Sequence, residues 1–207
     1  MKPFFWYASC GLLFATSALG CSTEPGYRAP TNIELIERAD LVILARVISA
    51  SASKEDGTVQ LRPLSVMKGS SPRRLSVIGG THDESGKPYA PTPTGLNEPH
   101  PSTRWGACIR QAYAPGALVI AMFSKTPAGY RQLNFSFARS IEDVEGPNAV
   151  WVQAARLYTQ ALRQKNRTAR RHALLQQQRR LERLWFNPTA RAITGDIAHH
   201  LRVTRNR

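Results

Sequence analysis

Few side chains in this sequence stand at spacings that suit catalysis. His82, Asp83 and Glu84 form the one tight cluster of residue types able to bind a metal, and no further ligand is spaced to share a face with them. A solvated turn is therefore the preferred interpretation of this cluster. Cys108 and His100 could act as a thiol nucleophile and its base, but no third group orients them. The usual hydrolase, metalloprotease and phosphate-loop motifs are missing. We expect no enzymatic activity and no cofactor.

Basic side chains in the last third of the chain are the strongest functional signal. Residues 22–146 carry a net charge of +2 and residues 147–207 one of +11, within a total of +14. Arginine's guanidinium fork binds phosphate oxygens bidentately. We therefore expect this segment to bind anionic lipid headgroups, lipopolysaccharide or an unknown envelope protein. The alternative is a solvated face in a chain that prefers arginine to lysine. The candidate binding residues are Arg163, Lys165, Arg167, Arg170, Arg171, Arg179, Arg180 and Arg183.

The N-terminus has the layout of an export signal. Lys2 precedes an uncharged stretch, residues 3–19, which is shorter than the roughly 20 residues of a spanning helix and ends in small side chains before Cys21. We predict a signal peptide over residues 1–20 and a Pro/Gly-containing tether over residues 21–31. Export makes nucleic acid an unsuitable partner for the basic segment.

The bond before Cys21 lies in a recognisable processing site. Ala18-Leu19-Gly20-Cys21 resembles the lipobox of bacterial lipoproteins, in which the cysteine sulfur carries a diacylglycerol. This resemblance implies membrane attachment by a lipid anchor, and Ser22 favours the outer membrane, facing the periplasm or the cell surface. The same residues also suit ordinary signal peptidase, which would leave a soluble periplasmic or secreted protein.

The pattern in the middle of the chain predicts short strands separated by Gly, Pro and Asp turns. We expect a helix that begins at the cap Asn32 and continues to Ala39. Five strands and a long polar loop follow, which predicts an α+β protein with a small five-stranded OB-like barrel over residues 32–146. The expected strands cover residues 41–48, 59–66, 75–78, 117–123 and 130–138, and the loop covers 81–107.

The pattern of the C-terminal region, residues 147–207, predicts helices. Trp151, Tyr158 and their neighbours recur at helical spacing after Gly146-Pro147. A second apolar stripe ends at Asn187-Pro188, and a short segment closes the chain. The stripe consists of Leu174, Leu181, Leu184 and Trp185.

Short motifs in the barrel region match a known family. They are residues 39–47, residues 66–69, Cys108 and residues 115–121. In these motifs the chain resembles the netrin-like domain, the OB-type barrel of the tissue inhibitors of metalloproteinases. In that family the terminal cysteine pairs with the cysteine before the fourth strand, so the resemblance implies a Cys21–Cys108 disulfide. Lipidation of Cys21 excludes this pairing.

These signals together predict an exported, lipid-anchored, non-enzymatic envelope interaction protein with a basic helical tail. The sequence favours lipidation of Cys21 over its pairing with Cys108, because an uncharged stretch precedes the cysteine and a tether follows it. The alternative function is that of a secreted inhibitor of a protease or another hydrolase, with a free terminal amine at Cys21.

Overall fold

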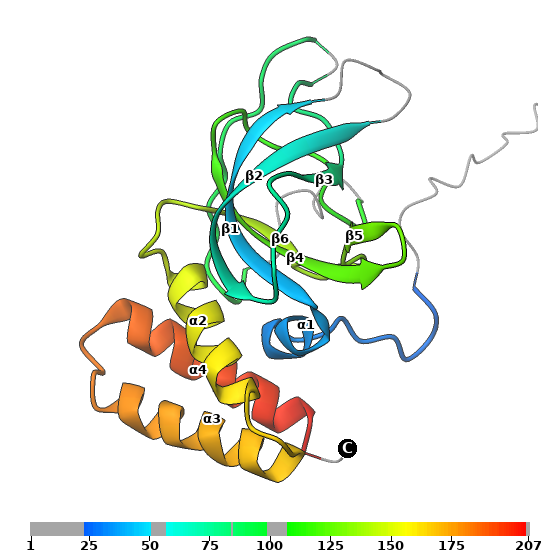
Figure 1. Ribbon diagram of the computed structural model, residues 1–207. Coiled ribbons are helices and arrows are strands. Elements are labelled where there is room, and N and C mark those ends of the chain that lie inside the picture. The colour runs from blue at the N-terminus through cyan, green and yellow to red at the C-terminus, as the bar shows by residue number, and fades with distance from the viewer. Residues whose placement is uncertain (1–22, 51–56, 84, 99–106, 206–207) are drawn as a thin grey trace, which may run out of the picture.

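The computed structural model contains one antiparallel sheet and four helices (Figure 1). The strands gather in one half of the molecule and the helices in the other. The predicted signal peptide and Cys21 lie outside the described residues, which are 23–50, 57–83, 85–98 and 107–205.

The sheet follows the order β3-β2-β1-β4-β5, and β6 pairs with β4 on the same edge as β5. Because β3 and β5, at the two ends of this path, contact each other, the sheet is nearly closed and barrel-like. The predicted α+β class with a small barrel-like sheet is confirmed at this level. The strands are β1 (Leu41–Ala50), β2 (Thr58–Lys68), β3 (Leu75–Ile78), β4 (Leu118–Thr126), β5 (Gly129–Gln132) and β6 (Ile141–Val144).

The two central strands are buried on both faces. Ile43 of β1 and Phe123 of β4 point into the barrel, whereas Val42 and Ile120 belong to a second core beneath the helices. A strand covered on both sides reads as a continuous apolar run instead of an alternating one. This explains the dense hydrophobic composition of residues 41–48.

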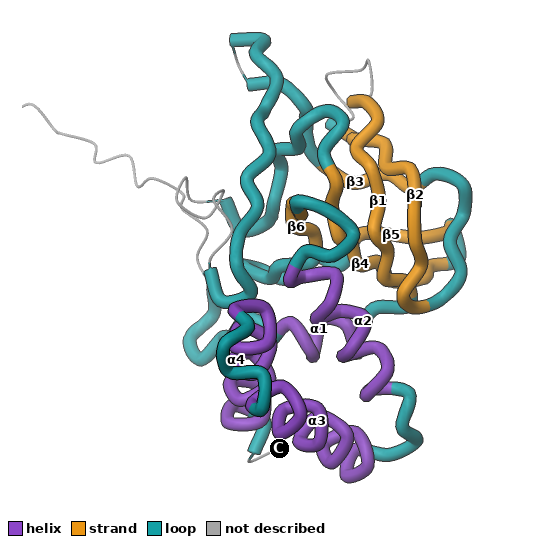
Figure 2. The backbone as a smooth tube through the Cα atoms, turned by 90° about the vertical axis from the view of Figure 1, so that its left-hand side faces the viewer, coloured by secondary structure: helices purple, strands orange, loops and turns teal. Residues whose placement is uncertain are grey.

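The helices cover the outer face of these strands. Trp151 and Tyr158 of α2 and Ile193 and Ile197 of α4 are buried in the second core. In Figures 1 and 2, α3 lies farthest from the strands, and it packs against α2 and α4. The helices are α1 (Asn32–Arg38), α2 (Val150–Leu162), α3 (Arg167–Glu182) and α4 (Pro188–Val203).

The chain between β4 and α2 differs from its predicted course. The fifth strand was expected to continue to residue 138, but β5 ends at Gln132. Phe137 has a φ of 59° and turns the chain, while its N–H donates to the Cys108 carbonyl. The sequence did not predict β6, because Glu142 and Asp143 put two charges into what is a fully buried strand.

Thr31, and not Asn32, is the N-cap of α1. The Thr31 side chain accepts from the Glu34 N–H, and the Glu34 carboxylate accepts from the Thr31 N–H, which completes a capping box. Asn32 instead donates from its amide to the Leu96 carbonyl and to the Asp196 carboxylate. The predicted N-cap is therefore present one residue earlier, at Thr31, because the Asn32 side chain is used in tertiary contacts.

Candidate functional site

The structure divides the eight predicted basic residues into two groups at opposite ends of α3. Arg171 and Arg179, the nearest members of the two groups, are eight residues apart on this helix, so about 12 Å along its axis separates the groups. All eight side chains are exposed except that of Arg170, which is half-buried. The first group is Arg163, Lys165, Arg167, Arg170 and Arg171, and the second is Arg179, Arg180 and Arg183.

A cavity of about 630 Å³ lies beside the first group. Arg167, Arg170 and Arg171 line it from α3, and Glu34 and Glu37 line it from α1. Its walls therefore carry charges of both signs, with an excess of arginine on the side of α3. Such a cavity can bind an anionic group through guanidinium N–H donors.

A second cavity of about 550 Å³ adjoins the first and shares Glu37 and Arg170 with it. Arg170 lies between the two and forms a 2.5 Å ion pair with Glu37. Lys68, at the end of β2, donates to the carbonyls of Ile36 and Glu37 at 2.8 and 2.9 Å. Burial lowers the pKa of Lys68, against the opposing charges of Asp40 and Glu37. The Lys68 ammonium thereby stabilises the C-terminal end of α1.

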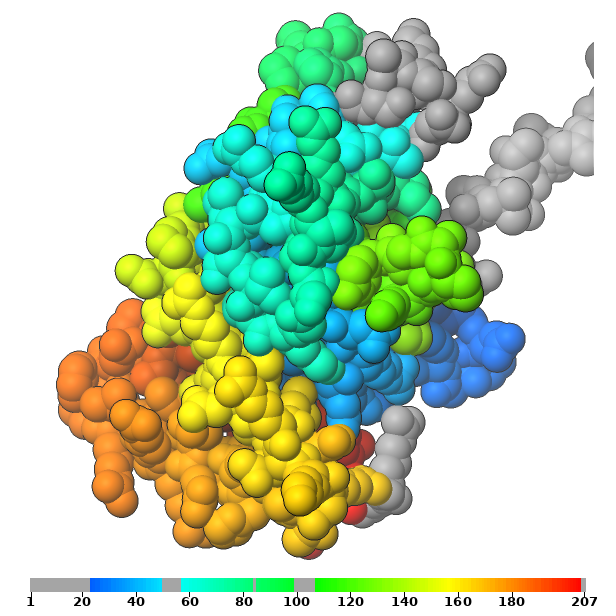
Figure 3. Space-filling view, viewed as in Figure 1, coloured from blue at the N-terminus to red at the C-terminus, as the bar shows by residue number. Residues whose placement is uncertain are grey.

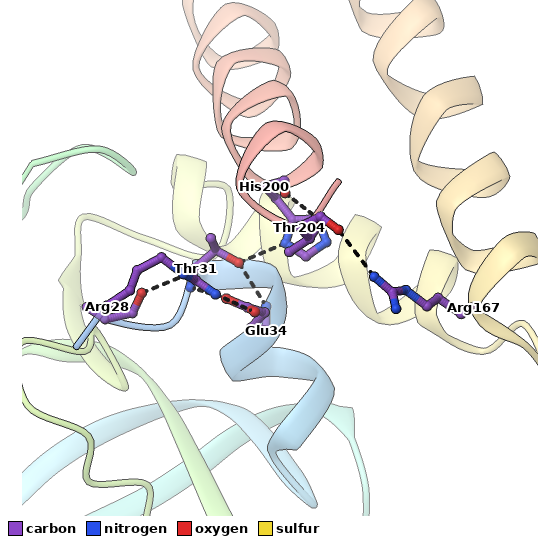
Figure 4. Close-up of polar contacts among 7 residues, drawn as sticks. Arg28, Thr31, Glu34, Arg167, His200 and Thr204 are labelled. Carbon is purple, nitrogen blue, oxygen red and sulfur yellow. Dashed lines mark hydrogen bonds and ion pairs between the residues drawn. The ribbon is translucent and has the colours of Figure 1, made fainter. Parts of the chain in front are cut away.

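A hydrogen-bonded cluster joins α1 to α4 at the edge of the first cavity (Figure 4). Thr31 Oγ1 lies 2.8 Å from Nδ1 of His200, and Arg28 forms a 2.7 Å ion pair with Glu34. Burial raises the pKa of Glu34, but its bonds to Arg28 and to the Thr31 backbone outweigh this and lower the pKa to about 2. Burial lowers the pKa of His200, against the opposing effect of Glu34 and Glu37, which favours the neutral imidazole.

The start of α3 is tied to the end of α4 in the same region. Arg167 donates to the Thr204 carbonyl at 3.2 Å, and the Thr204 hydroxyl donates to the His200 carbonyl at 2.7 Å (Figure 4). Arg167 therefore helps to hold the two helices together in addition to lining the cavity. Among the predicted binding residues, Arg167 and Arg170 have structural contacts, while Arg163, Lys165 and Arg171 are exposed.

A buried carboxylate in α4 was not identified from the sequence. Asp196 is 2% exposed and accepts from the Tyr158 hydroxyl at 2.7 Å and from the Asn32 amide at 3.0 Å. Burial raises its pKa, and these two hydrogen bonds oppose the rise. The cluster joins α1, α2 and α4, which indicates a structural role. The available sequence signal was an Asp on the helix face that also carries Ile193, Ile197 and Leu201.

Two buried ion pairs fix part of the predicted loop over β6. Arg110 pairs with Asp143 at 2.7 Å, and Arg139 pairs with Glu142 at 3.0 Å. Arg139 also donates to Thr94 and to the Gly95 carbonyl, and its guanidinium stacks over Trp151. Arg139 and the carboxylates of β6 thus hold the loop segment around residues 92–96 in place. None of these charged residues lies in a helix or strand predicted from the sequence.

The cluster of metal-capable residue types at positions 82–84 is a turn in the part that the structure describes. The Asp83 carboxylate accepts from the Ser85 N–H and hydroxyl and from the Lys87 N–H, which lowers its pKa. His82 lies 3.0 Å from the Thr81 hydroxyl, while Glu84 and His100 lie outside the described residues. Within the described ranges, no three His, Cys, Asp or Glu side chains are grouped to hold a metal.

Cys108 is disulfide-bonded. The other two cysteines of the chain, Cys10 and Cys21, lie outside the described residues. The choice between lipidation of Cys21 and its pairing with Cys108 therefore stays a prediction.

The second apolar stripe divides in the structure. Leu174 is buried and Leu181 packs against the second core, whereas Leu184 and Trp185, with the adjacent Phe186, are exposed in the turn after α3. Three consecutive apolar residues cannot share one face of a helix, and this was the sequence signal that could have revealed them. These side chains lie next to the second group of arginines.

No helix in the described ranges is long and apolar enough to cross a membrane. No family model matches the chain, and no curated protein matches it.

Proposed function

We propose that the chain is an exported, non-enzymatic envelope interaction protein whose helices contact an anionic surface or partner. The observation that carries this proposal is the exposure of Arg163, Lys165 and Arg171 around the start of α3, where Arg171 lines the first cavity and Arg163 the second. Lipid phosphates and the phosphates of lipopolysaccharide are the polyanions that an exported protein meets. The barrel-like sheet serves, in this proposal, as an OB-type, netrin-like interaction module, and Cys21 as the lipid anchor to the outer membrane.

Vesicle binding tests the anionic-surface proposal. The mature chain expected from the sequence, residues 21–207, is produced without lipid modification and mixed with phosphatidylglycerol or phosphatidylcholine vesicles. We expect binding to the anionic vesicles that weakens as salt rises, because each Lys or Arg near such a surface contributes about 1 kcal/mol at modest salt. Equal binding to both kinds of vesicle contradicts the proposal.

A matched pair of triple variants locates the binding surface. We expect Arg163→Ala/Lys165→Ala/Arg171→Ala to weaken binding about tenfold or more. The control, Arg62→Ala/Arg73→Ala/Arg74→Ala, removes the same charge from exposed positions on and after β2, and we expect it to leave most of the binding intact. If the two triple variants lose binding equally, net charge and not this surface explains the interaction.

The disulfide at Cys108 favours a second candidate function, that of a secreted inhibitor of a protease or another hydrolase. In the family that the barrel region resembles, this cysteine pairs with the N-terminal one, whose amine contacts the protease zinc. Mass spectrometry of the mature N-terminus tests this candidate. A free Cys21 amine with an intact Cys21–Cys108 crosslink supports it, whereas an acylated Cys21 excludes it.

A further inference from the structure

The turn between α3 and α4 exposes three consecutive apolar side chains. Leu184, Trp185 and Phe186 are 41%, 71% and 67% exposed, and we call these three residues the hairpin tip. Water contact of two adjacent aromatic rings is unfavourable for a folded chain, and contiguous exposed apolar groups mark interaction sites. We therefore expect a partner to cover the tip.

The tip is held in one conformation. The Leu184 N–H donates to the Leu181 carbonyl, and the Asn187 N–H donates to the Leu184 carbonyl, both at 2.8 Å. The Asn187 side chain then caps α4, and the rings of Trp185 and Phe186 meet edge to face at 6.4 Å. In Figures 1 and 3 this end of α3 and α4 projects at the left margin of the helices, away from the strands. Little ordering is needed before the tip meets a partner.

Arginines surround the hairpin tip on both sides in sequence. All four are exposed, and Glu182 is the one acidic residue between positions 179 and 191. Two copies of the tip would bring like charges together, which disfavours a second copy of this chain as the partner. An apolar tip flanked in sequence by exposed arginines matches a layer that is apolar inside and anionic outside. The four arginines are Arg179, Arg180, Arg183 and Arg191.

We propose that the hairpin tip inserts into the interfacial layer of an anionic lipid bilayer. Trp185 and Phe186 enter at the level of the headgroups and upper acyl chains, where aromatic side chains are favoured. The surrounding arginines bind lipid phosphates. The inference rests on the proposed function and adds a second contact to it: besides the first group of arginines, the C-terminal end of α3 meets the anionic surface, and the hairpin tip enters it.

Tryptophan fluorescence with brominated lipids tests insertion. The unlipidated chain, residues 21–207, is mixed with phosphatidylglycerol vesicles whose acyl chains carry bromine, which quenches indole at the apolar boundary. We expect a blue shift and quenching on binding. Trp105, which lies outside the described residues, is replaced by Phe in every protein of this experiment, and Trp151 is 1% exposed and serves as an unresponsive background. Trp185→Phe keeps an apolar tip, so we expect it to retain binding while losing the shift and the quenching.

Two double variants distinguish the contribution of the hairpin tip to binding from that of exposed apolar side chains elsewhere on the molecule. We expect Trp185→Ser/Phe186→Ser to weaken vesicle binding about tenfold at fixed salt, because the apolar contribution is lost and the charges remain. The control, Leu64→Ser/Ile78→Ser, removes side chains of the barrel that are 47% and 48% exposed, and we expect unchanged binding. Thermal unfolding of each variant shows that it is folded.

Each further result decides between the proposals. Salt-sensitive binding of equal strength in wild type and Trp185→Ser/Phe186→Ser, without quenching, overturns insertion and leaves the proposed function standing. Lack of binding to anionic vesicles at low salt overturns both. A concentration-dependent dimer that the same double variant abolishes, with Trp185 unquenched by the lipids, assigns the tip to a second copy of the chain and overturns insertion.

Discussion

Glu34 has two roles at the start of α1: it completes the capping box and it pairs with Arg28. Its pKa is about 2 in the folded protein, against an ordinary value of 4.5. Because the folded pKa is the lower one, ionised Glu34 stabilises the fold above about pH 4.5. This contribution is lost as the pH falls toward 2.

At the scale of this single residue, Glu34→Gln keeps a capping side chain and removes the charge. We expect the free energy of unfolding to fall by about 2 kcal/mol at pH 7 and the difference from wild type to vanish near pH 2. Urea unfolding across this pH range measures it. Glu145→Gln, at an exposed position, is the control, and we expect little change there. A loss that is the same at both pH values contradicts the assignment.

At the scale of the element, β6 depends on its arginine partners. Arg139→Ala leaves the fully buried Glu142 without its ion pair, and we expect a loss of about 3–5 kcal/mol in the free energy of unfolding. Adding Glu142→Gln removes the unpaired charge, so the double variant should be more stable than Arg139→Ala alone. Urea unfolding of both variants tests this order, and the reverse order would falsify the role assigned to the pair.

Helix α3 is mostly exposed along its length. Leu174 is the one buried residue among its 16. We expect Leu174→Ala to cost about 2–4 kcal/mol and to increase amide hydrogen exchange in α3 more than in β1. Leu184→Ala, in the exposed turn that follows, is the matched control and should cost less than about 0.5 kcal/mol. Equal costs for the two variants would show that α3 is not held through Leu174.

At the scale of the whole molecule, the state of Cys21 decides how the protein is placed in the envelope. Cys10 leaves with the predicted signal peptide, so Cys21 is the one intramolecular partner left for a disulfide at Cys108 in the mature chain. The secreted-inhibitor alternative therefore predicts that peptide mapping of the exported protein yields a Cys21–Cys108 crosslinked peptide and that Cys21→Ala is processed normally.

The lipoprotein hypothesis predicts the opposite result for the same variant. Under lipidation, Cys21→Ala accumulates as uncleaved precursor and is lost from the membrane fraction. Wild-type protein recovered with a diacylglycerol on Cys21 would contradict a Cys21–Cys108 disulfide and support the lipid anchor as the means of attachment.

What the sequence alone determined was local. The apolar runs of β1, β2 and β4 and the spacing of Trp151 and Tyr158 follow from composition and periodicity, and each predicted an element that the structure contains. The charge of residues 147–207 also follows from composition alone. The same signals identified all eight basic candidates.

Only the tertiary structure decided which of these residues meet. The charges of β6 are buried because Arg110 and Arg139 come from elsewhere in the chain, and no local pattern can show that pairing. The tertiary structure also brings Arg167 to Thr204 at the end of α4 and Arg170 to Glu37 of α1, contacts between residues far apart in the sequence. Trp185 and Phe186 are exposed since the turn after α3 directs them away from every core, so burial depended on packing geometry that hydrophobicity alone does not specify.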